Sequence, residues 1–429
     1  MAKTKQLPVG DARDMGFDPA RLGRIGRTMD AAVDARKVPG TITLVARKGR
    51  VVHTHVTGKL DVDRPRPLAI DSVFRMYSQT KPVTAAVLLT LYEDGLFMLD
   101  EPVSKWIPEF ANPRVVAYPQ KKDYVRTTSA VLTAATAAAR REITIFDLLT
   151  MTSGVPSMSR TPATYWPTLS PAWEGTGFAP GDTRINDPRA SYDELVLALA
   201  NNPLHSHPGD TWQYGSDFDV LTLFLTRASG MSLDRLFKTK MLEPLGMHDS
   251  DFYCSDANLN RLVTDHQWDA NGQLAVRDRP ETTEKAGGSN RKLMSGNGLF
   301  GGLLSTPWDY ARFAQMLANG GELDGARVLG RKTVELMTRN HIGERSIDLG
   351  TGPNYGFGFG VCVRKTNEGS FTPGSPGTFG WGGAAGTWFF VDPKEELIGL
   401  FFTHVFGYQF LPTADLFERF EKMTYEALA

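Results

Sequence analysis

Ser78 and Lys81 are the two residues of this 429-residue chain whose types and spacing most clearly suggest chemistry. They open an apolar segment that predicts a helix from Ser78 to Asp94, ended by Gly95. Residues three apart on a helix are neighbours, so the Lys81 amine would lie within reach of the Ser78 hydroxyl. The helix start would favour negative charge at Ser78, and burial would favour the neutral amine of Lys81, a base. Alternatively, Ser78 is an ordinary N-cap serine.

The same S-x-x-K pattern recurs at Ser289 to Lys292, so the four-residue match is not specific. Ser289 lies in a Gly-rich polar stretch with no helix pattern to hold Lys292 in place. We interpret this second copy as a surface loop.

A serine nucleophile without a histidine base needs another group to carry its proton. Tyr214 is the candidate, because it follows a turn at Pro208-Gly209-Asp210 and directly precedes a helix that begins at Asp217. Its phenol could exchange protons with Ser78 and Lys81. Alternatively, it is a core tyrosine with a satisfied hydroxyl.

The Gly-rich stretch from Phe379 to Thr387 runs directly into a predicted strand. Glycines allow a ligand to approach the backbone closely, so an N–H group here could join that of Ser78 in an oxyanion hole. The alternative is a Gly-rich β-turn.

Other motifs are absent or weak. The chain has no P-loop motif, no H-E-x-x-H and no G-x-S-x-G. Gly296 to Gly301 matches G-x-G-x-x-G, but it follows a polar loop rather than a strand and predicts a tight turn. The pairs His53/His55 and His205/His207 have a metal-ligand spacing of low specificity, and no further ligand completes either. We expect no metal and no cofactor.

Composition restricts the function classes. The chain has 47 Lys and Arg residues against 48 Asp and Glu residues. With a net charge near zero, it has no positive electrostatic field that would attract a nucleic acid. The two cysteines, Cys254 and Cys362, cannot build a disulfide framework, although one bridge stays open. The first 21 residues lack a signal-like apolar core, and no apolar run reaches roughly 18 residues. We therefore expect a cytoplasmic protein with no membrane contact.

Strand patterns occur at both ends of the chain and helix patterns in its middle. An amphipathic helix over 18–35 precedes strands at 41–45 and 51–56, and strands at 355–363, 387–391 and 397–404 precede a closing helix over 413–427. Capping boxes at Thr144 to Asp147 and Ser191 to Glu194, and helices over 217–229 and from Ser232, fill the middle. The pattern predicts an α+β fold, with an antiparallel sheet flanked by helices.

We expect two domains that are not sequential. Residues 1–76 and 293–429 would form an α/β domain, and residues 77–292 an inserted, mostly helical domain. Two long polar connections, 155–188 and 255–292, carry the aromatic residues Trp166, Trp173, Phe178 and Trp268. Long connections of this kind are usually walls or lids of a functional site.

Three motifs taken together resemble a known superfamily. Ser78-x-x-Lys81, Tyr214-x-Ser216 and Trp381-x-Gly383 are similar, in order and spacing, to the motifs of serine β-lactamases and penicillin-binding proteins. The most similar branch is the class C β-lactamase-like esterases called family VIII carboxylesterases. The resemblance extends from about Gly16 to Asp392 and includes the segments 81–85, 99–105, 148–154, 243–247 and 304–309.

The resemblance implies a fold and a set of roles. The fold is an antiparallel sheet made from both chain ends beside a mostly helical domain, with the site between them. Ser78 would be the acylated nucleophile, and Lys81 and Tyr214 its proton-handling partners. The backbone N–H groups of Ser78 and Ala384 would form the oxyanion hole.

Two departures from the β-lactamase pattern bear on the substrate. Trp381-Gly382-Gly383 stands in place of Lys-Thr-Gly, so an apolar indole replaces the cation that binds a β-lactam carboxylate, and Ser216 replaces an Asn. These four residues would contact the substrate, and an apolar, aromatic cleft suits short-chain, neutral esters of the p-nitrophenyl type. A β-lactamase, a D-amino-acid peptidase, an acyltransferase and a silent binding protein are the alternatives, and a homo-oligomer stays open.

Overall fold

The computed structural model describes residues 5–116, 136–156, 191–282, 296–298, 302–347, 354–370, 372–411 and 414–429. Several predicted features lie outside these ranges. They are the second S-x-x-K pattern at Ser289 to Lys292 and the aromatic residues Trp166, Trp173 and Phe178 of the first long connection.

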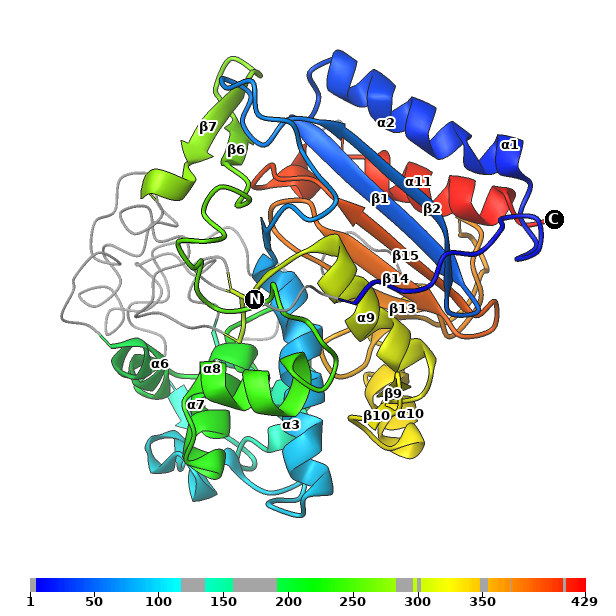
Figure 1. Ribbon diagram of the computed structural model, residues 1–429. Coiled ribbons are helices and arrows are strands. Elements are labelled where there is room, and N and C mark those ends of the chain that lie inside the picture. The colour runs from blue at the N-terminus through cyan, green and yellow to red at the C-terminus, as the bar shows by residue number, and fades with distance from the viewer. Residues whose placement is uncertain are drawn as a thin grey trace.

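A seven-stranded antiparallel sheet joins the two ends of the chain (Figure 1). Its order is β11-β12-β13-β14-β15-β1-β2, so the N-terminal hairpin extends the C-terminal strands. The strands are β1 Gly40–Arg47, β2 Arg50–Gly58, β11 Tyr355–Phe357, β12 Cys362–Arg364, β13 Phe379–Gly382, β14 Trp388–Asp392 and β15 Leu397–Phe402. The predicted α+β class, with its sheet from both termini, is confirmed.

Alternating side chains give the sheet two buried faces, because successive residues of a strand point to opposite sides. In β1, Leu44 belongs to one apolar cluster and Val45 to the other. Helices α2 Arg24–Asp34 and α11 Leu416–Glu426 cover the Val45 face, preceded by the short helix α1 Pro19–Leu22, and α9 Pro307–Ala318 covers the other (Figure 1). Strands β1, β14 and β15 are therefore buried on both faces.

The middle of the chain forms a helical group beside the sheet (Figure 1). Its helices are α3 Thr80–Glu93, α4 Ile145–Leu149, α6 Tyr192–Ala200, α7 Asp217–Ser229 and α8 Leu233–Phe237, and α8 continues into the π-helical turn η6 Lys238–Leu242. Every residue of α3 from Thr80 to Leu91 is buried, and α3 contacts both α7 and α8. A helix buried on all sides is a core element, so α3 is a fixed platform for the residues at its start.

Several predicted helix ends are confirmed. α7 spans 217–229 and ends at Gly230, which is left-handed with φ 65°. Thr144 and Asp147 form a reciprocal capping box, and Ser191 and Glu194 exchange the same pair of hydrogen bonds. One strand prediction is wrong: 355–363 forms two short strands, β11 and β12, because the chain turns at the left-handed Gly360.

The second long connection differs from its prediction. Residues 265–278 form a hairpin of β6 Asp265–Trp268 and β7 Leu274–Asp278 rather than an irregular lid. Trp268 packs with the cluster under α2 and donates its indole N–H to the Lys37 carbonyl at 3.3 Å. The expectation that Trp268 lines the substrate site is therefore wrong.

This hairpin also affects the expected domain division at residue 292. Backbone hydrogen bonds join Val73 to Arg261 and Val263, and His266 to His404. The segment is thus attached to the parts of the chain that were assigned to the α/β domain. We propose that the inserted helical part ends near residue 250 instead.

The remaining strands pair in twos: β3 Phe74–Arg75 with β8 Leu304–Ser305, β4 Arg114–Val116 with β5 Thr136–Ala138, and β9 Glu322–Leu323 with β10 Ala326–Arg327. Helix α10 Arg331–Thr338 follows β10. Within the described ranges, no helix has the length and apolar character that a membrane span requires. Both cysteines are free.

Candidate active site

Ser78 lies in a 3-10 turn, η1 Tyr77–Gln79, that leads directly into α3. It is half-buried, whereas every other residue from Ser72 to Leu91 is buried. Neither η1 nor α3 has a side-chain cap hydrogen bond, so the hydroxyl of Ser78 is not used as an N-cap. The serine is thus the one point in this stretch that is open to an incoming group.

The side-chain nitrogen of Lys81 is surrounded by three oxygen atoms. Its Nζ lies 3.1 Å from Ser78 Oγ, 2.6 Å from Tyr214 Oη and 2.6 Å from the main-chain oxygen of Asn297. The side chain is only 1% exposed. These three oxygen atoms occupy the hydrogen-bonding positions around the nitrogen, so the buried group is fully hydrogen-bonded.

Tyr214 closes a triangle with the serine and the lysine. Its Oη lies 2.5 Å from Ser78 Oγ and 2.6 Å from Lys81 Nζ, and Lys81 also stands 4.6 Å from the centre of the ring. Tyr214 is half-buried and lies just before α7, which packs on α3. The three side chains singled out from the sequence therefore meet, and the packing of α7 on α3 brings them together.

Aromatic rings surround the phenol of Tyr214. Trp381, on β13, stacks on it with ring centres 6.0 Å apart, and Phe357 meets Trp381 edge to face at 5.3 Å. Trp212 contacts both Tyr214 and Phe357. Trp381 is 4% exposed, so its indole supports Tyr214 from behind. Sequence reasoning missed Phe357 and gave Trp212 no role, because their spacing carries no motif.

The Gly-rich stretch after β13 runs beside the serine turn. A Cβ atom at Gly383 would overlap the main-chain oxygen of Met76, so only glycine allows this approach. The Gly383 N–H bonds to the Thr387 oxygen at 2.7 Å, and the Ala384 oxygen accepts from Gly407 N–H at 2.7 Å. Gly382, Gly383 and Ala384 are half-exposed. Ala384 is thus the residue directly after Gly383, which contacts the segment that carries the nucleophile.

A turn of residues 296–298 carries the third acceptor of Lys81. The Gly296 N–H donates to Thr222 Oγ1 at 2.9 Å, and the Thr84 hydroxyl donates to the Gly296 oxygen at 2.7 Å. The predicted G-x-G-x-x-G segment therefore begins as a turn at the site. Sequence reasoning missed Asn297, although two glycines around an asparagine signal an unusual backbone.

A buried polar network holds the residue before the serine. Tyr77 has φ 45°, a left-handed conformation that is uncommon outside glycine. Its hydroxyl donates to Asp265 at 2.6 Å, and Arg277 reaches the same carboxylate at 2.8 Å. Burial, followed by the nearby Asp265 charge, raises the pKa of the Tyr77 hydroxyl above its usual value, which keeps it a donor. The β6–β7 hairpin therefore fixes the entry into the serine turn.

Ser216 and Asp217 lie at the junction of Tyr214 and α7. Both are buried, and Asp217 accepts a hydrogen bond from the Ser153 hydroxyl at 2.5 Å. Burial raises the pKa of the Asp217 carboxyl to about 7, against the opposing effect of Ser153. This carboxyl ties the start of α7 to the 152–156 segment.

The histidine pairs do not assemble a metal site in the part of the chain that the structure describes. No group there contains three or more His, Cys, Asp or Glu side chains placed to hold a metal ion. His53 bonds to the Thr43 hydroxyl at 2.9 Å, His55 to Asp30 at 2.8 Å, and His207 accepts from Arg140 N–H at 3.2 Å.

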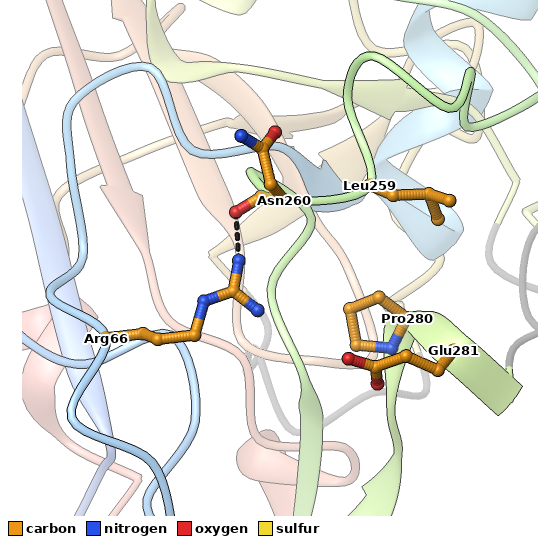
Figure 2. Close-up of a pocket in the computed structure, with 5 residues that line it drawn as sticks. All are labelled: Arg66, Leu259, Asn260, Pro280 and Glu281. Atoms are coloured by element: carbon orange, nitrogen blue, oxygen red, sulfur yellow. Dashed lines mark hydrogen bonds between the residues drawn. The ribbon is translucent and has the colours of Figure 1, made fainter.

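A surface hollow of about 330 Å³ lies elsewhere, between the 58–74 segment and the β7 end (Figure 2). Five residues line it: Arg66, Leu259, Asn260, Pro280 and Glu281. Arg66 donates to the Asn260 main-chain oxygen. The hollow contains none of the candidate site residues.

Comparison with known proteins shows the family. The sequence profile of the family described as Beta-lactamase matches residues 25–420, which is nearly the whole chain. The protein belongs to the Beta-lactamase family. Protein Rv1367c of Mycobacterium tuberculosis is 32% identical over 384 residues, with 86% of each chain covered. Esterase EstB of Burkholderia gladioli is 28% identical over 408 residues, covering 92% of this chain and 93% of the relative.

Solved structures share the fold of this Beta-lactamase family member. EstCE1, described as a hydrolase with promiscuous acyltransferase activity, superposes with a TM-score of 0.74 at 22% identity and covers 95% of this chain and 98% of its own. Simvastatin synthase LovD of Aspergillus terreus gives a TM-score of 0.75 at 22% identity, covering 94% and 98%. The chain is a serine hydrolase of the β-lactamase fold, in the branch similar to family VIII esterases.

Proposed function

We propose that this family member is a carboxylesterase that hydrolyses short-chain, neutral esters through an acyl-enzyme on Ser78. The closed triangle of Ser78 Oγ, Lys81 Nζ and Tyr214 Oη carries the proposal. A hydroxyl that contacts both a lysine amine and a phenol has two groups positioned to take its proton. The relatives described as esterases support the same chemistry.

In the proposed acylation step, Ser78 Oγ attacks the ester carbonyl while its proton passes to Lys81 or Tyr214. The oxyanion that forms would accept hydrogen bonds from the backbone N–H groups of Ser78 and Ala384. The C–O bond to the alcohol then breaks, and the alcohol leaves with the proton from the same pair. Water, losing its proton to the pair, attacks the acyl-enzyme, and the acid and free Ser78 result.

The substrate class follows from the groups beside the triangle. Trp381 places an indole where a Lys of the β-lactamase pattern would offer a cation, and its ring packs on Tyr214. Ser216 is buried next to Asp217. A site with rings at its back and no lysine at position 381 favours an uncharged acyl group over a carboxylate-bearing lactam. We propose that Trp381, Gly382, Gly383 and Ser216 shape this pocket.

Transfer of the acyl group to an alcohol other than water is the second candidate. Two relatives from Aspergillus terreus, 25% identical over 421 residues, are described as monacolin J acid methylbutanoyltransferases. The acyl-enzyme would be the same, and only the acceptor would differ.

One set of assays tests the proposal. The wild-type chain and Ser78→Ala are given p-nitrophenyl esters of increasing chain length, a cephalosporin, and an ester with added alcohol. We expect turnover of the short esters, little or none of the cephalosporin, and a loss of roughly 10⁴-fold or more in Ser78→Ala. A phosphonate should add one adduct to Ser78, seen by intact mass.

Three results would contradict the proposal. If the phosphonate does not label Ser78 and Ser78→Ala hydrolyses the esters at the wild-type rate, Ser78 is not the nucleophile. Faster cephalosporin than ester hydrolysis would identify a β-lactamase. A product ratio dominated by the transferred ester at low alcohol would identify an acyltransferase.

A further inference from the structure

We propose that Asp219 and Asn297 act together as a positioning relay that aims the amine of Lys81 at Ser78 and Tyr214. The inference rests on the proposed function, since it assigns a supporting role for the same triangle. Both residues would act on Ser78 through Lys81, so they are positioning residues rather than catalytic ones.

The relay is a continuous line of buried hydrogen bonds. Tyr192 donates its hydroxyl to one oxygen of the Asp219 carboxylate. The Asn297 side-chain amide donates to the other oxygen at 2.6 Å. The Asn297 main-chain oxygen, in turn, accepts from Lys81 Nζ at 2.6 Å. All four residues are buried, and Asp219 is 0% exposed.

The relay helps to hold the Asn297 carbonyl in its position facing Lys81. Asn297 lies between Gly296 and Gly298, where the backbone has little intrinsic preference for one conformation. Thr84 of α3 and Thr222 of α7 hold the turn on one side through Gly296. The Asp219 carboxylate holds it through the Asn297 amide. The carbonyl is thus anchored to two helices and points to Lys81.

A carbonyl at this point controls the direction of the amine lone pair. A carbonyl oxygen accepts hydrogen bonds and cannot donate, so it always takes an N–H of Lys81. A neutral amine has two N–H groups and one lone pair. Once one N–H is bound to Asn297, the other N–H and the lone pair remain for Ser78 Oγ and Tyr214 Oη. The lone pair of Lys81 then faces only Ser78 Oγ and Tyr214 Oη, the two groups from which the amine would take a proton.

The same helix therefore positions both proton partners. α7 begins three residues after Tyr214, and its first turn carries Asp219. A shift of this helix start would move the phenol directly and the lysine amine through Asn297. This shared support keeps the Ser78, Lys81 and Tyr214 distances constant relative to one another.

The test compares Asp219→Asn with the wild-type chain. The variant keeps the size of the side chain but has only one oxygen. Tyr192 and Asn297 can then no longer donate to separate oxygen atoms. We expect kcat for a p-nitrophenyl ester to fall roughly 10- to 100-fold, as when a proton-transfer group is misaligned, with KM unchanged within about twofold. The rate of phosphonate inactivation at Ser78 should fall by the same factor.

Asp392→Asn is the matched control. Asp392 is also 0% exposed and accepts a tyrosine hydroxyl, that of Tyr425, at 2.9 Å, but it lies at the end of β14, away from the triangle. The free energy of unfolding of Asp392→Asn, measured with urea, should fall as that of Asp219→Asn does. Its kcat and inactivation rate should stay at the wild-type values. The comparison of the two variants separates the effect of losing a buried carboxylate from the effect of misplacing the Lys81 amine.

A milder pair covers the case in which Asp219→Asn does not fold. Tyr192→Phe removes only the hydroxyl that supports Asp219, and Tyr425→Phe removes the equivalent one at Asp392. We expect a lower kcat for the first and an unchanged kcat for the second.

The outcomes distinguish the two proposals. If phosphonate does not label wild-type Ser78, the proposed function fails and the relay fails with it. If the wild-type chain is labelled but Asp219→Asn, or Tyr192→Phe in its place, matches its rate, the relay is wrong and Asp219 is purely structural. A KM that rises with kcat unchanged would also overturn the relay.

Discussion

The ring of Tyr214 makes contacts that are separate from those of its hydroxyl. The ring stacks on Trp381 and lies 4.6 Å from Lys81 Nζ, whereas the hydroxyl reaches Ser78 Oγ and Lys81 Nζ. A phenylalanine would keep both ring contacts. The proposed proton-transfer role of the hydroxyl can therefore be tested while the packing of the ring is kept.

We predict that Tyr214→Phe lowers kcat for p-nitrophenyl esters by about 10²- to 10⁴-fold, because a proton carrier is lost from the triangle. Steady-state kinetics on purified protein, with thermal unfolding in parallel, give the measurement. Tyr425→Phe is the control, since Tyr425 is a buried tyrosine whose hydroxyl donates to Asp392 at 2.9 Å, at the end of β14. Wild-type kcat in Tyr214→Phe would mean that Lys81 alone moves the proton.

At the scale of elements, the start of α7 carries a buried carboxyl, that of Asp217, whose charge depends on pH. Asp217 is buried, and burial raises the pKa of its carboxyl from 3.8 to about 7 in the folded chain. The folded state therefore holds a proton that the unfolded state has already lost between about pH 4 and 7. Its contribution to stability is complete below about pH 4 and is lost as the pH rises through 7.

We predict that Asp217→Asn removes this dependence. The free energy of unfolding of the wild-type chain should fall relative to that of the variant by more than about 1 kcal/mol between pH 5 and pH 8. Urea unfolding at a series of pH values measures the difference. Glu335→Gln on the surface of α10 is the control and should follow the wild-type curve. Parallel curves for the wild-type chain and Asp217→Asn would show that the carboxyl titrates normally.

At the scale of the whole molecule, the site depends on contacts between distant segments. Lys81 and Asn297 are separated by 216 residues, and Lys81 and Tyr214 by 133. Gly298 has φ 86°, and a Cβ there would overlap the Tyr77 carbonyl next to Ser78. The turn of 296–298 and the serine turn fit together only because this position has no side chain.

We predict that Gly298→Ala lowers esterase activity at least about tenfold and destabilises the fold, since the added methyl group must displace the Tyr77–Ser78 backbone. Gly230→Ala is the matched control. Gly230 has a similar φ of 65°, but among the described residues no heavy atom lies within 4 Å of the place that an added methyl group would take. It should lose only about 1–2 kcal/mol of stability from the left-handed backbone, with activity retained. Equal activity in the two variants would contradict the close fit at the site.

The local parts of this structure follow from the sequence. The Ser78 and Lys81 spacing, the end of α7 at Gly230 and the N-cap at Thr306 are set by side chains within a few residues of one another. The apolar and β-branched runs of β1, β14 and β15 predict strands, and the structure buries both faces of these strands. The motif order is also a property of the sequence alone, and it is enough to indicate the family.

The tertiary structure alone decided the rest. In the structure, Asn297 contacts Lys81, and Trp381 stacks on Tyr214. Trp268 lies on the α2 side of the sheet rather than in a wall of the site. Each of these contacts joins residues that are far apart in the chain. Such pairings depend on how α3, α7 and the sheet pack, and no local propensity or spacing encodes them.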